Sequence, residues 1–504
     1  MKKFCFKILF ILLSILTFNK SFADYNFNNN CKKAYSYSIN LDFINAKQII
    51  ITEKNNYPEN LIPYYLDNII DFLSIICSEN PDLFYTLKSN KQKRIELLEK
   101  GNTQSPYYRY CLAEVYLQWA TARIIFDEYL TAAYEINKAY KLLKKNNELF
   151  PYFTPNLKSL GILHALIGSI PDDYKWIMSI IGFEGTIEQG VNQLAIVLKS
   201  SLINDSYKHL SAETLFYLAY VSLNLNNDRD DVINIIKFVE SDKTINDFVK
   251  TSALVNFCVA NMYLRTKYNS DKAIQILSDF NPCKNCFSFT YRYYANGLAR
   301  LNRLDKNADA YFNIFLTENN GLNFIKSCYQ KLAWHCLINN DTLGYYKNMG
   351  KVKTMGNNKS EDDIQALAEA ESNEIPNIIL LKARLLFDGG YYKRAIDVLN
   401  TFDIKKPNTS NKDILEYTYR RARIYHEYGD TTQAVFYYLK TIELGETDIS
   451  YYAANACLNL GFIYEVQNNK DLAISYFKKA MSLNNTEYKY SINQKAKAGL
   501  NRIK

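Results

Sequence analysis

The sequence predicts an all-α protein, an α-solenoid of stacked helical hairpins preceded by a signal peptide. Three observations support this fold class. The 504 residues include only 17 glycines and 10 prolines, too few for a sandwich or barrel that turns about every ten residues. Apolar residues recur at spacings of three and four, as on one face of a helix. Small and aromatic residues recur at one fixed period in the C-terminal third, which is typical of helical repeats.

Composition excludes two broad classes of protein. The chain is 48% hydrophobic and 22% charged, close to globular averages, so it is not disordered throughout. Half of the net charge of +8 comes from four lysines within residues 1–23, which contain no acid. The remaining excess is small for a chain of this size, so we expect no nucleic-acid partner.

Residues 1–23 have the pattern of a secretory signal peptide. Lysines open the segment, Ile8–Phe18 form its apolar run, and Ser21 and Ala23 are the small residues of a cleavage site. We therefore expect an exported protein that begins near Asp24, in the bacterial periplasm or on the periplasmic face of the envelope. No later stretch is apolar enough to span a bilayer, so only peripheral envelope association is expected after cleavage. The alternative is an uncleaved N-terminal anchor.

The remainder divides into four segments by the regularity of its pattern. Residues 24–200 form an irregular helical region, and residues 201–355 contain degenerate helical hairpins. Residues 356–375 are expected to form a loop that carries a short helix. Residues 376–504 contain three regular repeats and a C-terminal helix.

The three regular repeats share a 39-residue period, which is the spacing from Ala383 to Ala422 and from Ala422 to Gly461. At these equivalent positions a small side chain allows two helix backbones to approach while a ring fills the groove beside them. Glycine or asparagine separates the two helices of each repeat, at Gly389-Gly390, Gly429-Asp430 and Asn468-Asn469, and tolerates a left-handed turn. The expected packing positions are Ala383, Ala395, Ala422, Tyr425, Ala434, Tyr438, Gly461, Tyr464, Ala473, Phe477 and Ala480.

This pattern resembles the tetratricopeptide repeat. The series Leu460-Gly461-x-x-Tyr464, Ala473, Phe477, Ala480 agrees with the repeat position by position. The series Arg421-Ala422-x-x-Tyr425, Ala434, Tyr438 is a slightly weaker copy. The period is longer than is usual for the family, and the surplus lies in the loops that join the repeats.

A second, local pattern lies in a short part of the N-terminal half and consists of Ser169-Ile170-Pro171, Trp176-Ile177, Ile181–Thr186, Gly190 and Leu194. This pattern resembles the tetratricopeptide repeat protein 39 and inclusion-body-clearance family, in which a proline-bearing helix leads through a Gly-Phe-x-Gly turn into another helix. Here Gly182 is expected to cap one helix, Thr186 and Gln189 to cap the next, and Gly190 to permit close helix contact.

No motif for catalysis or cofactor binding occurs. The four histidines are isolated, and the sequence contains no H-E-x-x-H, G-x-S-x-G or phosphate-binding loop. We therefore expect no enzyme activity, no catalytic residue, no cofactor and no metal. Cys283 and Cys286 form a C-x-x-C pair in a loop, which is open to a small structural disulfide or an inert loop, to redox chemistry, or to half of a zinc site.

The resemblance to tetratricopeptide repeats implies a non-catalytic scaffold that binds a protein or peptide segment in its concave groove. The first helix of each repeat lines that groove, and two arginines on neighbouring helices suit a carboxylate or an acidic segment. In one alternative, both arginines pair with loop acids of the adjacent repeat. In another, the protein is an envelope-assembly component that handles lipid or outer-membrane precursors. The expected partner-binding residues are Arg384, Phe387, Tyr419, Arg420, Arg423, His426, Phe462 and Glu465.

Overall fold

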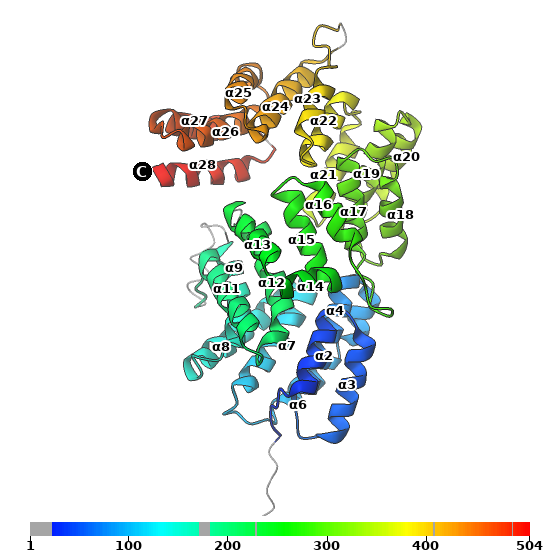
Figure 1. The fold of residues 1–504 in the computed structure, drawn as a ribbon, viewed down its shortest axis with the longest axis vertical. Helices are drawn as coiled ribbons and strands as arrows, with labels where there is room; N and C mark the ends of the chain where they lie inside the picture. Colours follow the sequence, from blue (N-terminus) through cyan, green and yellow to red (C-terminus); the bar gives the residue numbers. More distant parts are fainter. Residues whose placement is uncertain (1–22, 171–181, 227–228, 407–408, 486, 504) are drawn as a thin grey trace, which may run out of the picture. The chain divides into compact units, whose positions relative to one another are not determined.

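A computed structural model describes residues 23–170, 182–226, 229–406, 409–485 and 487–503 (Figure 1). Within these ranges the regular elements are helices, and the only β-type pairing is an isolated parallel bridge between Asp24 and Asn60. The predicted all-α class is therefore confirmed for the described residues. The expected signal peptide lies outside them, apart from Ala23. In the described ranges, no helix combines the length and the hydropathy needed to cross a membrane.

The chain folds as two compact units. The N-terminal unit comprises residues Met1–Val259 and Asp279–Thr290, and the C-terminal unit comprises Ala260–Ser278 and Tyr291–Lys504. The division expected near residue 200 marks a change in the regularity of the sequence pattern, and it stays a prediction.

The described part of the N-terminal unit consists of helices joined by short loops, together with a 3₁₀ turn and a π-helical stretch. Its elements are α2 (Asn29–Ile39), α3 (Phe43–Asn56), α4 (Ile62–Ser78), α5 (Pro81–Leu87), α6 (Asn90–Leu98), α7 (Pro106–Ile125), α8 (Tyr129–Leu149), α9 (Pro155–Gly168), α11 (Ile187–Ile203), η1 (Lys208–Leu210), α12 (Ser211–Val221), η2 (Ser222–Asn226), α13 (Arg229–Ser241), α14 (Lys243–Thr251) and the start of α15 (Ala253–Arg265).

A buried ionic cluster lies in the core of this unit. Lys158 of α9 is fully buried, and its Nζ donates to Glu114 Oε2 of α7 at 3.0 Å and to Glu213 Oε2 of α12 at 2.6 Å. The hydroxyls of Ser159 and Tyr35 donate to the same two carboxylates. A buried charge is tolerated only when it is paired and hydrogen-bonded, so this cluster holds α2, α7, α9 and α12 in register.

The described part of the local resemblance has the expected turn geometry. Gly182 has a positive φ of 77°, and Thr186 caps α11 by accepting a hydrogen bond from Gln189 N at 3.0 Å. A Cβ at Gly190 would lie 2.5 Å from Gly161 O of α9, which confirms the close helix contact expected there. Residues 171–181, which carry the proline and tryptophan of the resemblance, lie outside the described residues.

The C-x-x-C pair is a disulfide in the structure. Cys283 and Cys286 are bonded to each other in a loop of the N-terminal unit. The following residue, Phe287, donates its backbone N–H to Leu41 O at 2.8 Å, and its ring lies 5.3 Å from that of Phe43. The geometry therefore agrees with the structural-disulfide interpretation. The free cysteines of the described chain are buried except Cys336, which is half-buried.

The C-terminal unit contains the helical hairpins of the repeat array. Its elements are the end of α15, α16 (Ser270–Ser278), α17 (Tyr291–Asn302), α18 (Ala308–Glu318), α19 (Ile325–Ile338), α20 (Thr342–Thr354), α21 (Glu361–Ser372), α22 (Ile378–Asp388), α23 (Tyr392–Leu399), α24 (Asn411–Tyr428), α25 (Thr431–Gly445), α26 (Tyr452–Val466), α27 (Lys470–Ser482) and α28 (Lys489–Ile503). Helix α21 lies within residues 356–375, the segment for which a loop and a short helix were expected.

The regular repeats correspond to the pairs α22–α23, α24–α25 and α26–α27. The N-caps of α24, α25 and α27 are Ser410, Asp430 and Asn469, and the side-chain oxygen of each accepts a hydrogen bond from the N–H of the third helical residue. The turns within the pairs contain Gly390, Gly429 and Asn468, at φ of 83°, 94° and 58°. The left-handed turns predicted from glycine and asparagine are thus confirmed.

The small and aromatic positions of the repeat lie between these helices. Tyr425 and Tyr464 are half-buried and stack on Tyr437 and Tyr476 of the second helix, with centroids 5.8 and 5.5 Å apart. The remaining expected packing positions are buried: Ala383, Ala395, Ala422, Ala434, Tyr438, Gly461, Ala473, Phe477 and Ala480.

Candidate functional site

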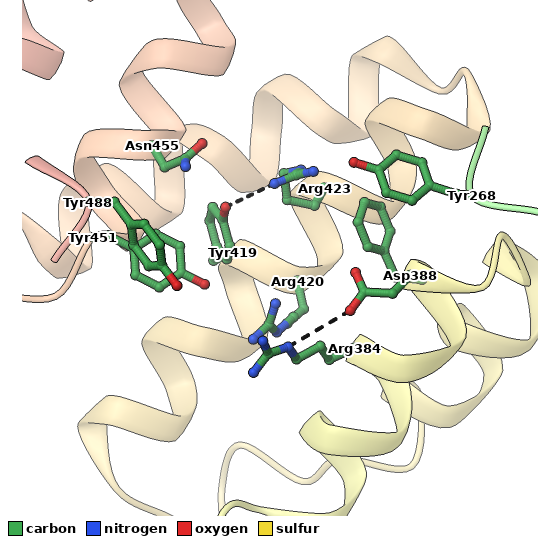
Figure 2. A pocket seen from close by; sticks show the side chains of 10 residues that line it. Tyr268, Arg384, Asp388, Tyr419, Arg420, Arg423, Tyr451, Asn455 and Tyr488 are labelled. Atoms are coloured by element: carbon green, nitrogen blue, oxygen red, sulfur yellow. Dashed lines mark hydrogen bonds and ion pairs between the residues drawn. The ribbon is translucent and has the colours of Figure 1, made fainter. Parts of the chain in front are cut away.

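A pocket of about 280 Å³ lies in the C-terminal unit, among the first helices of the three repeats (Figure 2). Helices α22, α24 and α26 supply most of its lining because the repeat period places equivalent positions side by side. The lining residues are Tyr268, Arg384, Phe387, Asp388, Tyr419, Arg420, Arg423, Tyr451, Asn455 and Tyr488.

Arg423 is the arginine of the pocket that has no acidic partner among the residues described by the structure. Its Nη1 donates to the hydroxyl of Tyr419 at 3.2 Å, one helical turn earlier, and its guanidinium lies 5.0 Å from the ring centroid of Phe387. Among the described residues, no carboxylate forms an ion pair with it. Burial lowers its pKa, but the surrounding tyrosine hydroxyls, Tyr419 first, more than offset this effect and the net pKa is raised. Arg423 is therefore a cation with most of its donors unused.

The other two arginines pair with acids of their own helices. Arg420 is held by Glu416, whose Oε1 accepts from Nε at 3.0 Å and from Nη2 at 2.8 Å. Arg384 makes a looser pair, with 3.9 Å between its Nε and Asp388 Oδ2. One alternative was that Arg384 and Arg423 pair with loop acids of an adjacent repeat. It is wrong for the described residues, because the acidic partner of Arg384 is Asp388, one helical turn away on the same helix.

Arg384 also contacts a side chain of α19. Its guanidinium lies 4.9 Å from the ring centroid of Trp334, and Lys331 Nζ lies 4.0 Å from the same ring. Trp334 is fixed in turn by its Nε1, which donates to Glu369 Oε1 at 2.8 Å. Burial and, less strongly, the charge of Arg384 lower the pKa of Lys331 to about 8.

Tyrosine rings form the walls of the pocket. Tyr451 and Tyr488 pack edge to face, with centroids 5.0 Å apart, and lie together at one side of Figure 2. Tyr268 lies at the opposite side, with its ring 5.3 Å from that of Phe387. A Cβ at Gly390 would lie 1.7 Å from Tyr268 O. Only glycine allows the turn between α22 and α23 to approach the segment before α16 so closely.

The structure brings together five of the eight partner-binding residues expected from the sequence: Arg384, Phe387, Tyr419, Arg420 and Arg423. His426 instead faces Tyr438, with its Nδ1 3.2 Å from the Tyr438 hydroxyl. Phe462 and Glu465 contact the C-terminal helix α28. Arg502 of that helix donates to both carboxylate oxygens of Glu465, at 2.7 and 2.8 Å, and its guanidinium lies 5.9 Å from the Phe462 centroid.

Sequence reasoning missed five residues that line the pocket. Asp388 and Asn455 lie on the first helices of the predicted repeats. Helical periodicity could have found Asp388, which lies one turn after Arg384. The 39-residue period could have found Asn455, which lies one repeat after Glu416. Tyr451 is the N-cap of α26 and forms a tyrosine doublet with Tyr452, the first residue of that helix. The sequence holds no comparable signal for the remaining two, Tyr268 and Tyr488, because both come from irregular segments outside the three repeats.

Comparison with known proteins identifies one repeat of the array. Residues 454–487 match the family model of the tetratricopeptide repeat, so the resemblance drawn from the repeat pattern is supported for its last copy. No curated protein matches the chain. Among solved structures, the crystal structure of the yeast Tom70 is 16% identical and covers 94% of this chain and 95% of that one, with a TM-score of 0.24. A likeness at this score carries no argument about fold or function.

Proposed function

We propose that this protein is a non-catalytic scaffold that binds a protein or peptide segment in the concave surface of its C-terminal repeats. The observation that carries the proposal is the pocket among α22, α24 and α26. Equivalent faces of three successive hairpins converge there, and repeat arrays use such extended concave surfaces for binding. A tetratricopeptide repeat at residues 454–487 is part of the same array.

The side chains of this surface suit recognition of a segment. Tyrosine and arginine are the residues most enriched at the energetic centres of protein interfaces. Here Tyr419 and Tyr451 supply rigid rings, and Arg384 supplies a cation whose side chain is 40% exposed. The pocket admits a few side chains rather than a folded domain, so the ligand is an extended or helical segment.

The test is capture of partners from an envelope extract by the purified protein. Arg384→Glu combined with Arg423→Glu reverses two charges at the pocket and should abolish capture while the helical circular dichroism spectrum stays unchanged. Arg394 of α23 is exposed outside the pocket and stacks on Tyr391 at 5.0 Å, so Arg394→Glu is the matched control. Identical captured proteins for the wild type and the double variant would contradict the proposal.

We also propose that the protein is exported and works in the periplasm or at the periplasmic face of the envelope. The support is the signal-peptide pattern of residues 1–23 and a disulfide between Cys283 and Cys286, which persists in oxidising compartments. Cell fractionation tests this directly. Recovery of the protein in the cytoplasmic fraction at its full, uncleaved mass would contradict export.

One observation favours a second function, the handling of lipid. On α8, Leu130 and Tyr134 are 91% and 65% exposed, and Lys141, Lys144 and Lys145 follow further along the same helix. An apolar patch followed by lysines suits an anionic membrane surface. Vesicles of phosphatidylglycerol and phosphatidylcholine should bind the wild type but not Leu130→Ser with Tyr134→Ser. Equal sedimentation of both with the vesicles would exclude this patch as the lipid-binding surface, and no sedimentation of the wild type would exclude the function.

A further inference from the structure

A second, smaller pocket lies between α20 and α21 of the C-terminal unit, and its lining residues differ from those of the pocket among the regular repeats. Its volume is about 130 Å³, which is room for about four groups of the size of a water molecule. Helix α20 contributes Tyr345, Tyr346 and Met349, and the last turns of α21 contribute Glu369 and Ala370. The pocket is therefore built from the second helix of one hairpin and the helix that follows it.

The pocket combines buried apolar groups with an exposed aromatic ring. Met349 and Ala370 are buried. Tyr346 is 54% exposed, and its ring packs edge to face on that of Tyr345, with centroids 5.7 Å apart. A Cβ at Gly350 would meet nothing within 4 Å, so the pocket is open on this side. An apolar stem can thus enter from solvent and lie against an aromatic face.

The polar groups of the pocket are acceptors. Glu369 is half-buried, and among the described residues no cation forms an ion pair with it. Its Oε1 accepts from Trp334 Nε1 at 2.8 Å and its Oε2 from Gln330 Nε2 at 2.5 Å. Both donors are neutral, so the carboxylate keeps its charge. The Tyr345 hydroxyl donates to Glu374 O at 3.3 Å, which leaves its oxygen lone pairs for a ligand. Burial and, after it, the charge of Glu369 raise the pKa of Tyr345.

The end of α21 adds to the negative potential of the pocket. The helix ends at Ser372, its C-cap Asn373 has a left-handed φ of 54°, and Ala370 and Asn373 line the pocket. The carbonyl end of a helix carries a partial negative charge that favours cations. Lys353 is the cation of the lining, but it is exposed and donates to Asn373 Oδ1 at 2.8 Å. The carboxylate of Glu369 is left for the cation of a ligand.

We propose that this pocket binds an alkylammonium group, from a lysine side chain of a protein or from a free polyamine, with Glu369 as its anionic ligand. The inference goes beyond the proposed function, because it concerns a different site. The methylene stem lies against the Tyr346 ring, which also attracts the cation through its π face. Each oxygen of Glu369 already accepts one hydrogen bond, so the paired edge that a planar guanidinium needs is taken. An ammonium is a compact point charge and needs a single lone pair.

The test is a titration of the full chain, followed by the NMR signals of the methionine methyl groups. The probes are Nα-acetyl-lysine amide, which represents a lysine side chain, and putrescine, which represents a free polyamine. Nα-acetyl-norleucine amide is the uncharged isostere. We expect the methyl signal of Met349, assigned through Met349→Leu, to shift with at least one charged probe and not with the isostere. Met355, the C-cap of α20, lies outside the lining and should not shift. The charged probe that binds more tightly identifies the source of the ammonium group.

Three variants test the role of the carboxylate. Glu369→Gln should weaken the affinity about tenfold, as expected for the loss of a charged hydrogen bond. Lys353→Met removes a cation that competes with the ligand and should tighten binding several-fold. Glu371 is an exposed carboxylate of the same helix outside the lining, so Glu371→Gln is the matched control and should bind as the wild type does.

Tyr346→Ala completes the set, because it removes an exposed ring and leaves the hydrogen bonds of Glu369 in place. It should also weaken binding. The inference is overturned if the Met349 signal stays unchanged with both charged probes, if it shifts equally with the isostere, or if Glu369→Gln and Tyr346→Ala bind as tightly as the wild type. Partner capture by the double charge reversal reports on the other pocket alone, so the proposed function and this inference fail separately.

Discussion

The ring of Phe477 lies directly against Gly461, so closely that a Cβ at position 461 would be 2.5 Å from two of its ring carbons. Gly499 of α28 lies equally close to the same ring on another side, also at 2.5 Å. Phe477 is fully buried, and with glycine on two sides it cannot shift to make room. The last repeat and the C-terminal helix are therefore held together around one side chain.

Gly461→Ala should lower the free energy of unfolding by about 1–3 kcal/mol, since added volume in a packed core forces neighbouring groups apart. Urea denaturation measures the change. Gly350 of α20 is the matched control, because a Cβ there meets nothing within 4 Å. Gly350→Ala should stabilise the protein by up to about 1 kcal/mol through helix propensity alone. A stability change of the same sign in both variants would contradict this packing.

Gly390→Ala should disturb the wall of the pocket. Both Gly390 and Gly429 have left-handed φ, at 83° and 94°, but a Cβ would contact Tyr268 O at Gly390 and nothing within 4 Å at Gly429. The two alanine variants therefore share the backbone strain and differ in the contact. We expect Gly390→Ala to be the more destabilised and to weaken partner capture, whereas Gly429→Ala captures normally. Equal thermal stability would show that the turn can move away from Tyr268.

Lys331→Met should change the pH dependence of stability. Burial lowers the pKa of Lys331 to about 8, below its value of 10.5 in the unfolded chain, so the unfolded state binds more protons between these two pH values. The free energy of unfolding of the wild type therefore rises from pH 8 to 10.5 by up to about 3 kcal/mol from this group. The variant lacks that rise.

The measurement is urea denaturation of the wild type and Lys331→Met at pH 7 and pH 10, which cancels the other titrating groups. The free energy of unfolding of Lys331→Met, minus that of the wild type, should be larger at pH 7 than at pH 10. Lys347→Met, at an exposed position of α20, should show no such difference. A constant gap between Lys331→Met and the wild type would contradict the prediction.

Lys158→Met should be severely destabilising. It leaves Glu114 and Glu213 buried without their cation, which costs about 3–5 kcal/mol in comparable pairs. Lys145 pairs with Glu148 at the surface, where both side chains are more than half exposed, and Lys145→Met should cost less than about 1 kcal/mol. Thermal denaturation distinguishes the two. Adding Glu213→Gln to Lys158→Met should restore part of the loss, and a further loss instead would refute the ionic account.

The sequence predicted the repeats well because their packing is local. Ala383, Ala422 and Gly461 recur at one period, and each lies buried between helices that are adjacent in the chain. The turns followed from glycine and asparagine, since their conformational freedom is a property of the residue itself. The same period places Arg384 and Arg423 at equivalent positions of neighbouring repeats, and both residues line one pocket.

The repeat period could not predict which residues of other helices pack against a given face of a repeat helix. Phe462 and Glu465 occupy groove-facing positions by the pattern, yet Arg502 of α28 engages both. His426 was expected in the groove and faces Tyr438 instead. In each case the deciding residue comes from another helix, and its position depends on how that helix packs.

The sequence by itself determined the all-α class, the register of the last three hairpins and the set of arginines on their first helices, because these depend on side-chain size and spacing along one helix. Only the tertiary structure decided that Tyr268 and Tyr488 line the pocket and that Lys158 is buried between two glutamates. It also decided that Glu416 neutralises Arg420, whereas Arg423 has no acidic partner in the described part of the chain. The reason is physical: the charge balance and solvent access of a side chain are set by every element around it, and long-range contacts leave no period in the chain.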